Sequence, residues 1–144
     1  KLHMIGKLQT NKVKFAVKLF DFIHSVDTEK LAKKVADEQL KINKKIKIFI
    51  QVNIGEEDQK SGINKNELND FVSYCKNIDL DVIGLMCIPP INSNSSDYFQ
   101  DMKLLNNDFS FKELSMGMSS DYLEASKNFA TYLRIGSSIF GQRV

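Results

Sequence analysis

Two stretches near the end of the chain, residues 114–124 and 133–143, combine residue types that could bind an anion. In each stretch, a short apolar run that predicts a buried strand gives way to small and hydroxyl residues: Ser119, Ser120 and Asp121 in the first, and Gly136, Ser137 and Ser138 in the second. Helix N-termini and glycine turns present unpaired N–H groups, which attract anions and phosphate above all. Two consecutive strand–loop junctions of this kind suggest a barrel phosphate site, although two ordinary βα turns would have the same spacing.

The elements that must position these stretches alternate between strand and helix six times. The strands are mostly continuous apolar runs, as expected of parallel strands covered on both faces. They span residues 2–6, 22–26, 46–54, 81–86, 111–118 and 131–135, and the helices begin near Thr10, Thr28, Asn64, Asp97 and Asp121. This alternation predicts an α/β fold with a parallel sheet, either an open doubly wound sheet or a (β/α) barrel. No GxGxxG motif follows the first strand, so a dinucleotide-binding fold gains no support.

Local patterns give further expectations. Leu2–Gly6 is predicted to be a core strand, and one helix has an apolar stripe formed by Leu31, Ala32, Val35, Ala36 and Leu40. Thr28 can cap that helix, and the pairs Asn64/Glu67 and Asp121/Glu124 have capping-box spacing. A closed barrel needs eight strands. Because six are found and the first follows directly after Lys1, we expect the natural chain to extend upstream of Lys1.

Composition narrows the class of protein. The 144 residues suit one domain, and 42% of them are hydrophobic, enough for a folded core. The net charge is only +2, which argues against a nucleic-acid partner. No apolar run approaches the roughly 20 residues of a membrane span, so no membrane partner is expected. Cys75 and Cys87 have neither metal-site spacing nor a disulfide pattern, which fits a reducing cytoplasm and predicts no metal site.

Six motifs in order give the chain a family resemblance. They are residues 3–12, 23–27, 51–54 with 60–62, 84–90, and the two terminal stretches. Together they resemble the pyridoxal phosphate homeostasis protein family, the YggS/PROSC-like proteins, over essentially all 144 residues. The resemblance implies a (β/α)8 TIM barrel similar to the N-terminal domain of alanine racemase, a pyridoxal 5′-phosphate (PLP) fold of type III. It also implies that residues 1–144 are the six C-terminal βα units of that single, partial, PLP-binding domain.

The same resemblance assigns roles to residues. The family binds PLP as a Schiff base on a lysine of its first strand, which lies upstream of this chain, so no catalytic residue is expected here. Arg134 matches the arginine that faces the pyridine nitrogen, and Ser119, Gly136 and Ser137 match the phosphate site. Since arginine stays protonated, it would keep the ring nitrogen unprotonated and weaken the ring as an electron sink. The alternative for Arg134 is an ion pair with a carboxylate under the barrel.

Other candidates for the pocket are less specific. His3 is expected to line the site, whereas His24, flanked by apolar residues, is more typical of a structural histidine. Asn53 is a candidate to lie beside the ring. Met86 would pack near the cofactor or belong to the ordinary core. The chain departs from the family pattern at Leu2, where an aromatic residue is usual, and around Phe129, where a small residue or glycine is usual.

The resemblance implies a protein of vitamin B6 homeostasis that carries or buffers PLP, with PLP-dependent apoenzymes as recipients, and no established turnover. Near-balanced charge is compatible with a monomer. An alternative is a PLP-dependent racemase-like enzyme of the same barrel type, which would need a second acid/base residue, often supplied by another domain. A barrel enzyme for another phosphorylated substrate would need carboxylates at strand ends. The two found there, Asp27 and Asp121, have the positions of helix caps.

Overall fold

The computed structural model describes residues 1–141, so the last part of the second stretch, residues 142 and 143, lies outside the described residues. Its six strands form one parallel sheet in the order β1-β2-β3-β4-β5-β6. The strands are β1 (His3–Met4), β2 (Phe22–Val26), β3 (Lys47–Val52), β4 (Asp81–Cys87), β5 (Glu113–Met118) and β6 (Tyr132–Arg134). The helices are α1 (Val13–Leu19), α2 (Glu29–Lys41), α3 (Leu68–Asn77), α4 (Ser95–Asp108), α5 (Tyr122–Lys127) and α6 (Ser137–Phe140), with 3-10 turns η1 (Thr10–Lys12) and η2 (Lys65–Glu67).

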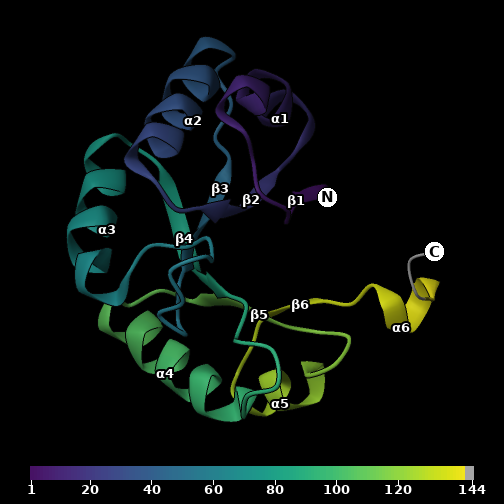
Figure 1. The fold of residues 1–144 in the computed structure, drawn as a ribbon. Helices are drawn as coiled ribbons and strands as arrows, with labels where there is room; N and C mark the ends of the chain where they lie inside the picture. Colours follow the sequence, from purple (N-terminus) through teal and green to yellow (C-terminus); the bar gives the residue numbers. More distant parts are fainter. Residues whose placement is uncertain (142–144) are drawn as a thin grey trace.

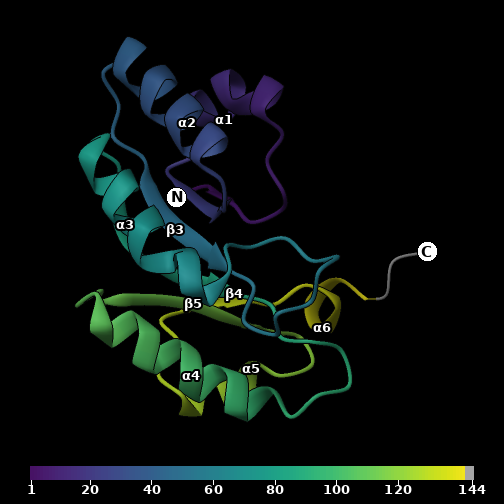
Figure 2. The same ribbon diagram turned by 60° about the vertical axis from the view of Figure 1, so that its left-hand side comes forward.

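The sheet is curved, with its helices on the outer side. Figures 1 and 2 show the strands along the inner side of an arc, with α2, α3, α4 and α5 outside it. Although β1 and β6 are at opposite ends of the sheet, the rings of His3 and Tyr132 lie only 5.6 Å apart. The sheet therefore curls around a concave face. The predicted fold, six βα units of a (β/α) barrel, is confirmed.

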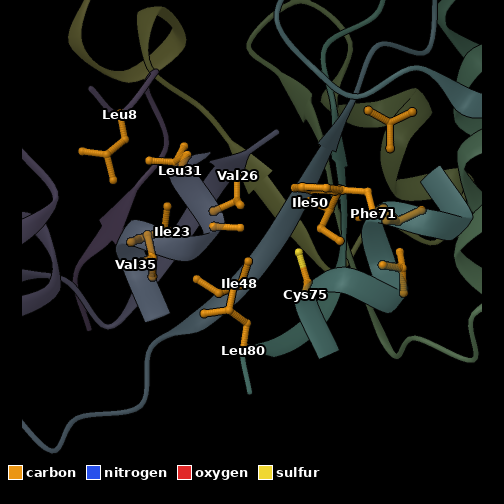
Figure 3. Packing of buried hydrophobic residues seen from close by; sticks show 14 of the residues in the cluster. Leu8, Ile23, Val26, Leu31, Val35, Ile48, Ile50, Phe71, Cys75 and Leu80 are labelled. Atoms are coloured by element: carbon orange, nitrogen blue, oxygen red, sulfur yellow. The ribbon is translucent and has the colours of Figure 1, made fainter. Parts of the chain in front are cut away.

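Both faces of the sheet carry buried apolar side chains. On the outer face Ile23 and Val26 of β2 and Ile48 and Ile50 of β3 belong to one buried cluster with helix residues (Figure 3), among them Leu31, Val35, Phe71 and Cys75. On the concave face a smaller cluster joins Phe22, Phe49 and Met86. Successive side chains of a strand point to opposite faces. A strand covered on both sides thus becomes the continuous apolar run seen in the sequence.

Two predictions of burial were wrong. Of the expected core strand Leu2–Gly6, only His3–Met4 is a strand, and Leu2 and Ile5 are 50% and 48% exposed. The reason is that β1 is an edge strand, paired to β2 alone. Leu40 was expected to be buried but is 81% exposed. It lies in the last turn of α2, just before the chain turns away at Asn43 with φ 49°, so it faces solvent.

Predicted helix starts were partly right. The Thr28 hydroxyl accepts a hydrogen bond from the Leu31 amide at 3.2 Å and caps α2, as expected. The two capping boxes do not form. The side-chain amide of Asn64 donates to the Glu67 carboxylate, and Asn64 precedes the 3-10 turn η2, not α3. The Asp121 carboxylate accepts a hydrogen bond from the backbone amide of Met118. The α4 helix begins at Ser95, two residues before the predicted Asp97.

Candidate functional site

A chain of four hydrogen-bonded side chains crosses the concave face. His3 Nδ1 lies 3.0 Å from His24 Nε2, and His24 Nδ1 lies 2.8 Å from Ser115 Oγ. Arg134 then donates through NH1 to Ser115 Oγ at 2.9 Å. These residues come from β1, β2, β5 and β6. Strand pairing places β1 beside β2 and β5 beside β6, and the curvature of the sheet brings β2 and β5 together.

Arg134 is a partly buried cation with neutral partners. Its second donor, NH2, gives a hydrogen bond to the Cys87 carbonyl at 2.8 Å. Burial lowers the pKa of Arg134 from its ordinary value. Within residues 1–141 Arg134 has no ion pair with a carboxylate, so the alternative of an Arg–carboxylate pair is wrong for the described part of the chain. A guanidinium without a counter-charge favours an electron-rich ligand.

The two histidines are neutral at pH 7. Burial lowers the pKa of His24 to about 3, helped by the nearby His3 and the Arg134 charge. Burial also lowers the pKa of His3 below its ordinary 6.5. Aromatic rings pack around both: His3 stacks on Phe22 with ring centroids 4.1 Å apart, and His24 stacks on Phe49 at 4.3 Å. Each imidazole in this chain therefore has one N–H donor and one acceptor nitrogen.

An open pocket of about 360 Å³ lies at this place. Its lining includes three residues predicted from the sequence: His3, Arg134 and Gly136. The rest of the lining comes from Ile5, His24, Tyr132, Leu133 and Ile135. Two regions that are about 130 residues apart in sequence, β1 and β6, thus form one pocket.

The expected phosphate turn sits at the carboxyl ends of β5 and β6. Ser119 Oγ accepts hydrogen bonds from the backbone amides of Gly136, at 3.1 Å, and Ser138, at 3.2 Å. The Ser138 hydroxyl donates to the Ser119 carbonyl at 3.4 Å. The sequence suggested that these two amides are unpaired. In the structure both of them donate to one exposed oxygen, Ser119 Oγ. The geometry brings Ser119, Gly136 and Ser137 to one turn, with Ser137 between the two donating amides.

Asn53 and Met86 lie away from this pocket lining. The Asn53 amide donates to the Glu57 carbonyl at 2.9 Å, and its Oδ1 accepts from the Glu57 amide at 3.2 Å. It therefore holds the loop that follows β3. Met86 is buried against Phe22 and Phe49 and forms part of the floor of the concave face.

Comparisons with known proteins place the chain in a family. The family model that describes the N-terminal domain of alanine racemase matches residues 1–144. The chain belongs to this family. Within it, the resemblance to pyridoxal phosphate homeostasis proteins is confirmed: the one from Aquifex aeolicus (strain VF5) is 36% identical over 98% of this chain, and the one from Synechocystis sp. (strain ATCC 27184 / PCC 6803 / Kazusa) is 35% identical over 99%.

A solved structure supports the same relationship. PipY of Synechococcus elongatus PCC7942, with PLP bound, has a TM-score of 0.87 and 30% identity, covering 96% of this chain and 69% of that chain. The chain covers only part of the length of these relatives. It spans 66% of the Aquifex protein and 70% of the Synechocystis protein, about two thirds of their length.

Two residues in or beside this pocket, Ser115 and Tyr132, were not predicted from the sequence. Ser115 links His24 to Arg134, and the ring of Tyr132 lies 5.3–5.8 Å from the rings of His3, Phe22, His24 and Phe49. The signal for both was strand alternation. Glu113 and Ser115 share one face of β5, and Tyr132 and Arg134 share one face of β6, which makes those faces more polar than their neighbours.

Two absences hold for the described part of the chain. Among residues 1–141, no three His, Cys, Asp or Glu side chains are grouped so that they could hold a metal ion. No helix in that range has the length and apolar character needed to cross a membrane. Cys75 and Cys87 are free and buried, and burial raises the pKa of each thiol to about 12.

Proposed function

We propose that the protein containing this chain binds PLP and carries or buffers it in vitamin B6 homeostasis. The observation that carries the proposal is the partly buried Arg134 guanidinium, which has neutral partners and lines a pocket together with Gly136. The backbone amides of Gly136 and Ser138 both point at Ser119 Oγ beside it. A cation and converging N–H donors suit a ligand that has an acceptor nitrogen at one end and a phosphate at the other. The names of its relatives give that ligand as PLP.

The described residues fit this cofactor. Arg134 would face the pyridine nitrogen, Ser119, Gly136 and Ser137 would hold the phosphate, and His3 would line the pocket beside the ring. Met86 would support the ring from the floor, and Asn53 would act through the loop after β3. When bound, PLP supplies an aldehyde that can react with amines and a ring that can accept electrons. Because a protonated Arg134 leaves the ring nitrogen without a proton, the ring accepts electrons weakly. This favours a carrier over an enzyme that depends on the ring.

Further features of the whole protein belong to the proposal. The lysine that attaches PLP would lie in a strand upstream of Lys1. PLP-dependent apoenzymes would receive the cofactor. The near-balanced charge, 20 basic and 18 acidic residues, supports a monomer, and two free buried thiols support a cytoplasmic location.

A titration of the full-length protein with PLP tests the proposal. We expect a visible absorption band of lysine-bound PLP, which disappears on borohydride reduction and in a variant that lacks the upstream lysine. Pyridoxal, which lacks the phosphate, serves as the matched ligand and should bind more weakly. A full-length protein that stays colourless with excess PLP would exclude the proposal.

A further inference from the structure

The chain of hydrogen bonds from Arg134 to His3 has a direction. Arginine has donors only, so Ser115 Oγ must be the acceptor in the bond from Arg134 NH1. Ser115 is fully buried, and a buried hydroxyl proton without an acceptor is costly. Among the contacts of Ser115 Oγ in the described residues, His24 Nδ1 at 2.8 Å is the one that can accept that proton. Ser115 therefore accepts from Arg134 and donates to His24.

The direction continues through both histidines. Because His24 Nδ1 accepts from Ser115, the single proton of a neutral His24 is on Nε2. That proton points at His3 Nδ1, 3.0 Å away. His3 Nδ1 is then an acceptor, and a neutral His3 carries its proton on Nε2. The reverse direction would require Ser115 Oγ to accept twice and would leave its own proton unpaired in a fully buried place.

We propose that Ser115 and His24 are positioning residues that transmit the donor character of Arg134 across the concave face and hold His3 in the Nε2–H tautomer. His3 then offers the pocket a hydrogen-bond donor and not a base. His3 and Arg134 both line the pocket, so two donors from opposite ends of the sheet would address one ligand, which must bring acceptor atoms. The inference rests on the proposed function for the identity of that ligand, PLP, but the tautomers do not depend on it.

Nitrogen-15 NMR of the imidazole side chains reads the tautomers directly. The full-length protein is labelled at histidine and measured at pH 7 without added PLP, and the signals of His3 and His24 are assigned by their loss in His3→Gln and His24→Gln. We expect both residues to be single Nε2–H tautomers. A His3 protonated on Nδ1, or present as a mixture of tautomers, would overturn the proposal.

Variants of His24 test whether the hydrogen-bonded series of side chains sets the tautomer of His3. His24→Gln keeps an amide that can accept from Ser115 and donate to His3, so His3 should remain a single Nε2–H tautomer. His24→Leu can do neither, and His3 should become a mixture. If His3 is unchanged in His24→Leu, His24 does not set its tautomer and the proposal fails. The wild-type spectrum decides the direction of the chain even where a variant does not fold.

Two matched serine variants test whether the hydrogen bonds of Ser115, and not the burial of a serine in general, set the tautomers of the histidines. Ser25 is as buried as Ser115, lies beside His24 in sequence and donates to the Gly6 carbonyl at 2.7 Å. Ser115→Ala should turn His24 into a mixture of tautomers and weaken PLP binding about five-fold, the effect of one lost hydrogen bond. Ser25→Ala should leave the tautomers of both histidines unchanged. Equal spectra for the two variants would refute the role of Ser115. A wild type with the expected tautomers but no PLP binding would refute the proposed function alone.

Discussion

Gly84 of β4 pairs with Glu113 of β5 and lies close to its backbone, which makes Gly84→Ala a sharp test of the sheet that carries the site. A Cβ added there would lie 2.6 Å from the Glu113 carbonyl carbon, closer still to its oxygen, and 3.1 Å from the Phe49 ring. Distances below 3.0 Å are essentially never seen for Cβ atoms. The overlap is with backbone, so it is relieved only if β5 moves away from β4.

The size of the effect follows from the pairing of these strands. Three residue pairs join β4 to β5: Gly84–Glu113, Leu85–Leu114 and Met86–Ser115. If separation costs one hydrogen bond of 0.5–1.5 kcal/mol at each pair, the free energy of unfolding falls by about 3 kcal/mol. In a protein of this size such a loss lowers the melting temperature by about 6–12 °C. Ser115 would also be displaced, so PLP binding should weaken.

The assay is urea denaturation of the full-length protein, followed by circular dichroism. Gly6→Ala is the matched control, because nothing lies within 4 Å of a Cβ built at Gly6. It should change the free energy of unfolding by less than about 0.5 kcal/mol. A Gly84→Ala protein as stable as the Gly6→Ala control would refute the close approach of the two strands.

Three further predictions follow from single contacts. Arg134→Met should weaken PLP binding by about 10-fold or more, the value of a hydrogen bond to a charged group, as measured by PLP titration; unchanged affinity would exclude contact between Arg134 and the ring. Burial holds the pKa of His24 at about 3 in the folded protein, below its ordinary 6.5, so between these pH values the unfolded chain binds a proton that the folded chain does not. Stability should therefore fall as the pH falls from 6.5 to 3, by up to about 5 kcal/mol from this group, and His24→Gln should show a shallower dependence in urea denaturation at several pH values; parallel curves would contradict the burial of His24. Thr28→Ala should cost about 1 kcal/mol of stability by removing the cap of α2, whereas Asn64→Ala, whose side chain does not cap α3, should cost much less; equal losses would argue against the Thr28 cap.

The sequence predicted the order of the elements because each strand and helix has a period that its own residues determine. The apolar runs of β2 to β5 and the stripe of α2 are of this local kind. The exposure of Leu40 was missed because it depends on where α2 ends and the chain turns away. The exposure of Leu2 was missed because it depends on which strand lies at the edge of the sheet. Neither fact is present in a local pattern.

Candidate site residues could be predicted where they follow the end of a strand in a recognisable motif. They were missed where only the curvature of the sheet brings them to the site. Ser119, Gly136 and Ser137 follow strand ends directly, so spacing alone pointed to them. Ser115 and Tyr132 gain their importance from contacts across the concave face, to residues 91 positions away in the case of Ser115 and His24. Phe129 shows a third limit, because its backbone conformation and its exposure could not be read from the local pattern. It has φ 67°, a conformation that favours glycine, and it is 65% exposed, with the Lys103 ammonium 3.5 Å from the centre of its ring.

The most direct test of the central claim, that the turn after β6 holds the phosphate of PLP, compares two ligands on the wild type and two variants. The affinities of the full-length wild type and of Ser119→Ala are measured for PLP and for pyridoxal, with Ser73→Ala, an exposed serine of α3, as the control. Loss of a hydrogen bond to a charged group should weaken PLP binding about 10-fold or more in Ser119→Ala, while the affinity for pyridoxal changes less than about two-fold. Equal losses for both ligands, or no loss for PLP, would contradict the assignment of the phosphate to Ser119 and its turn.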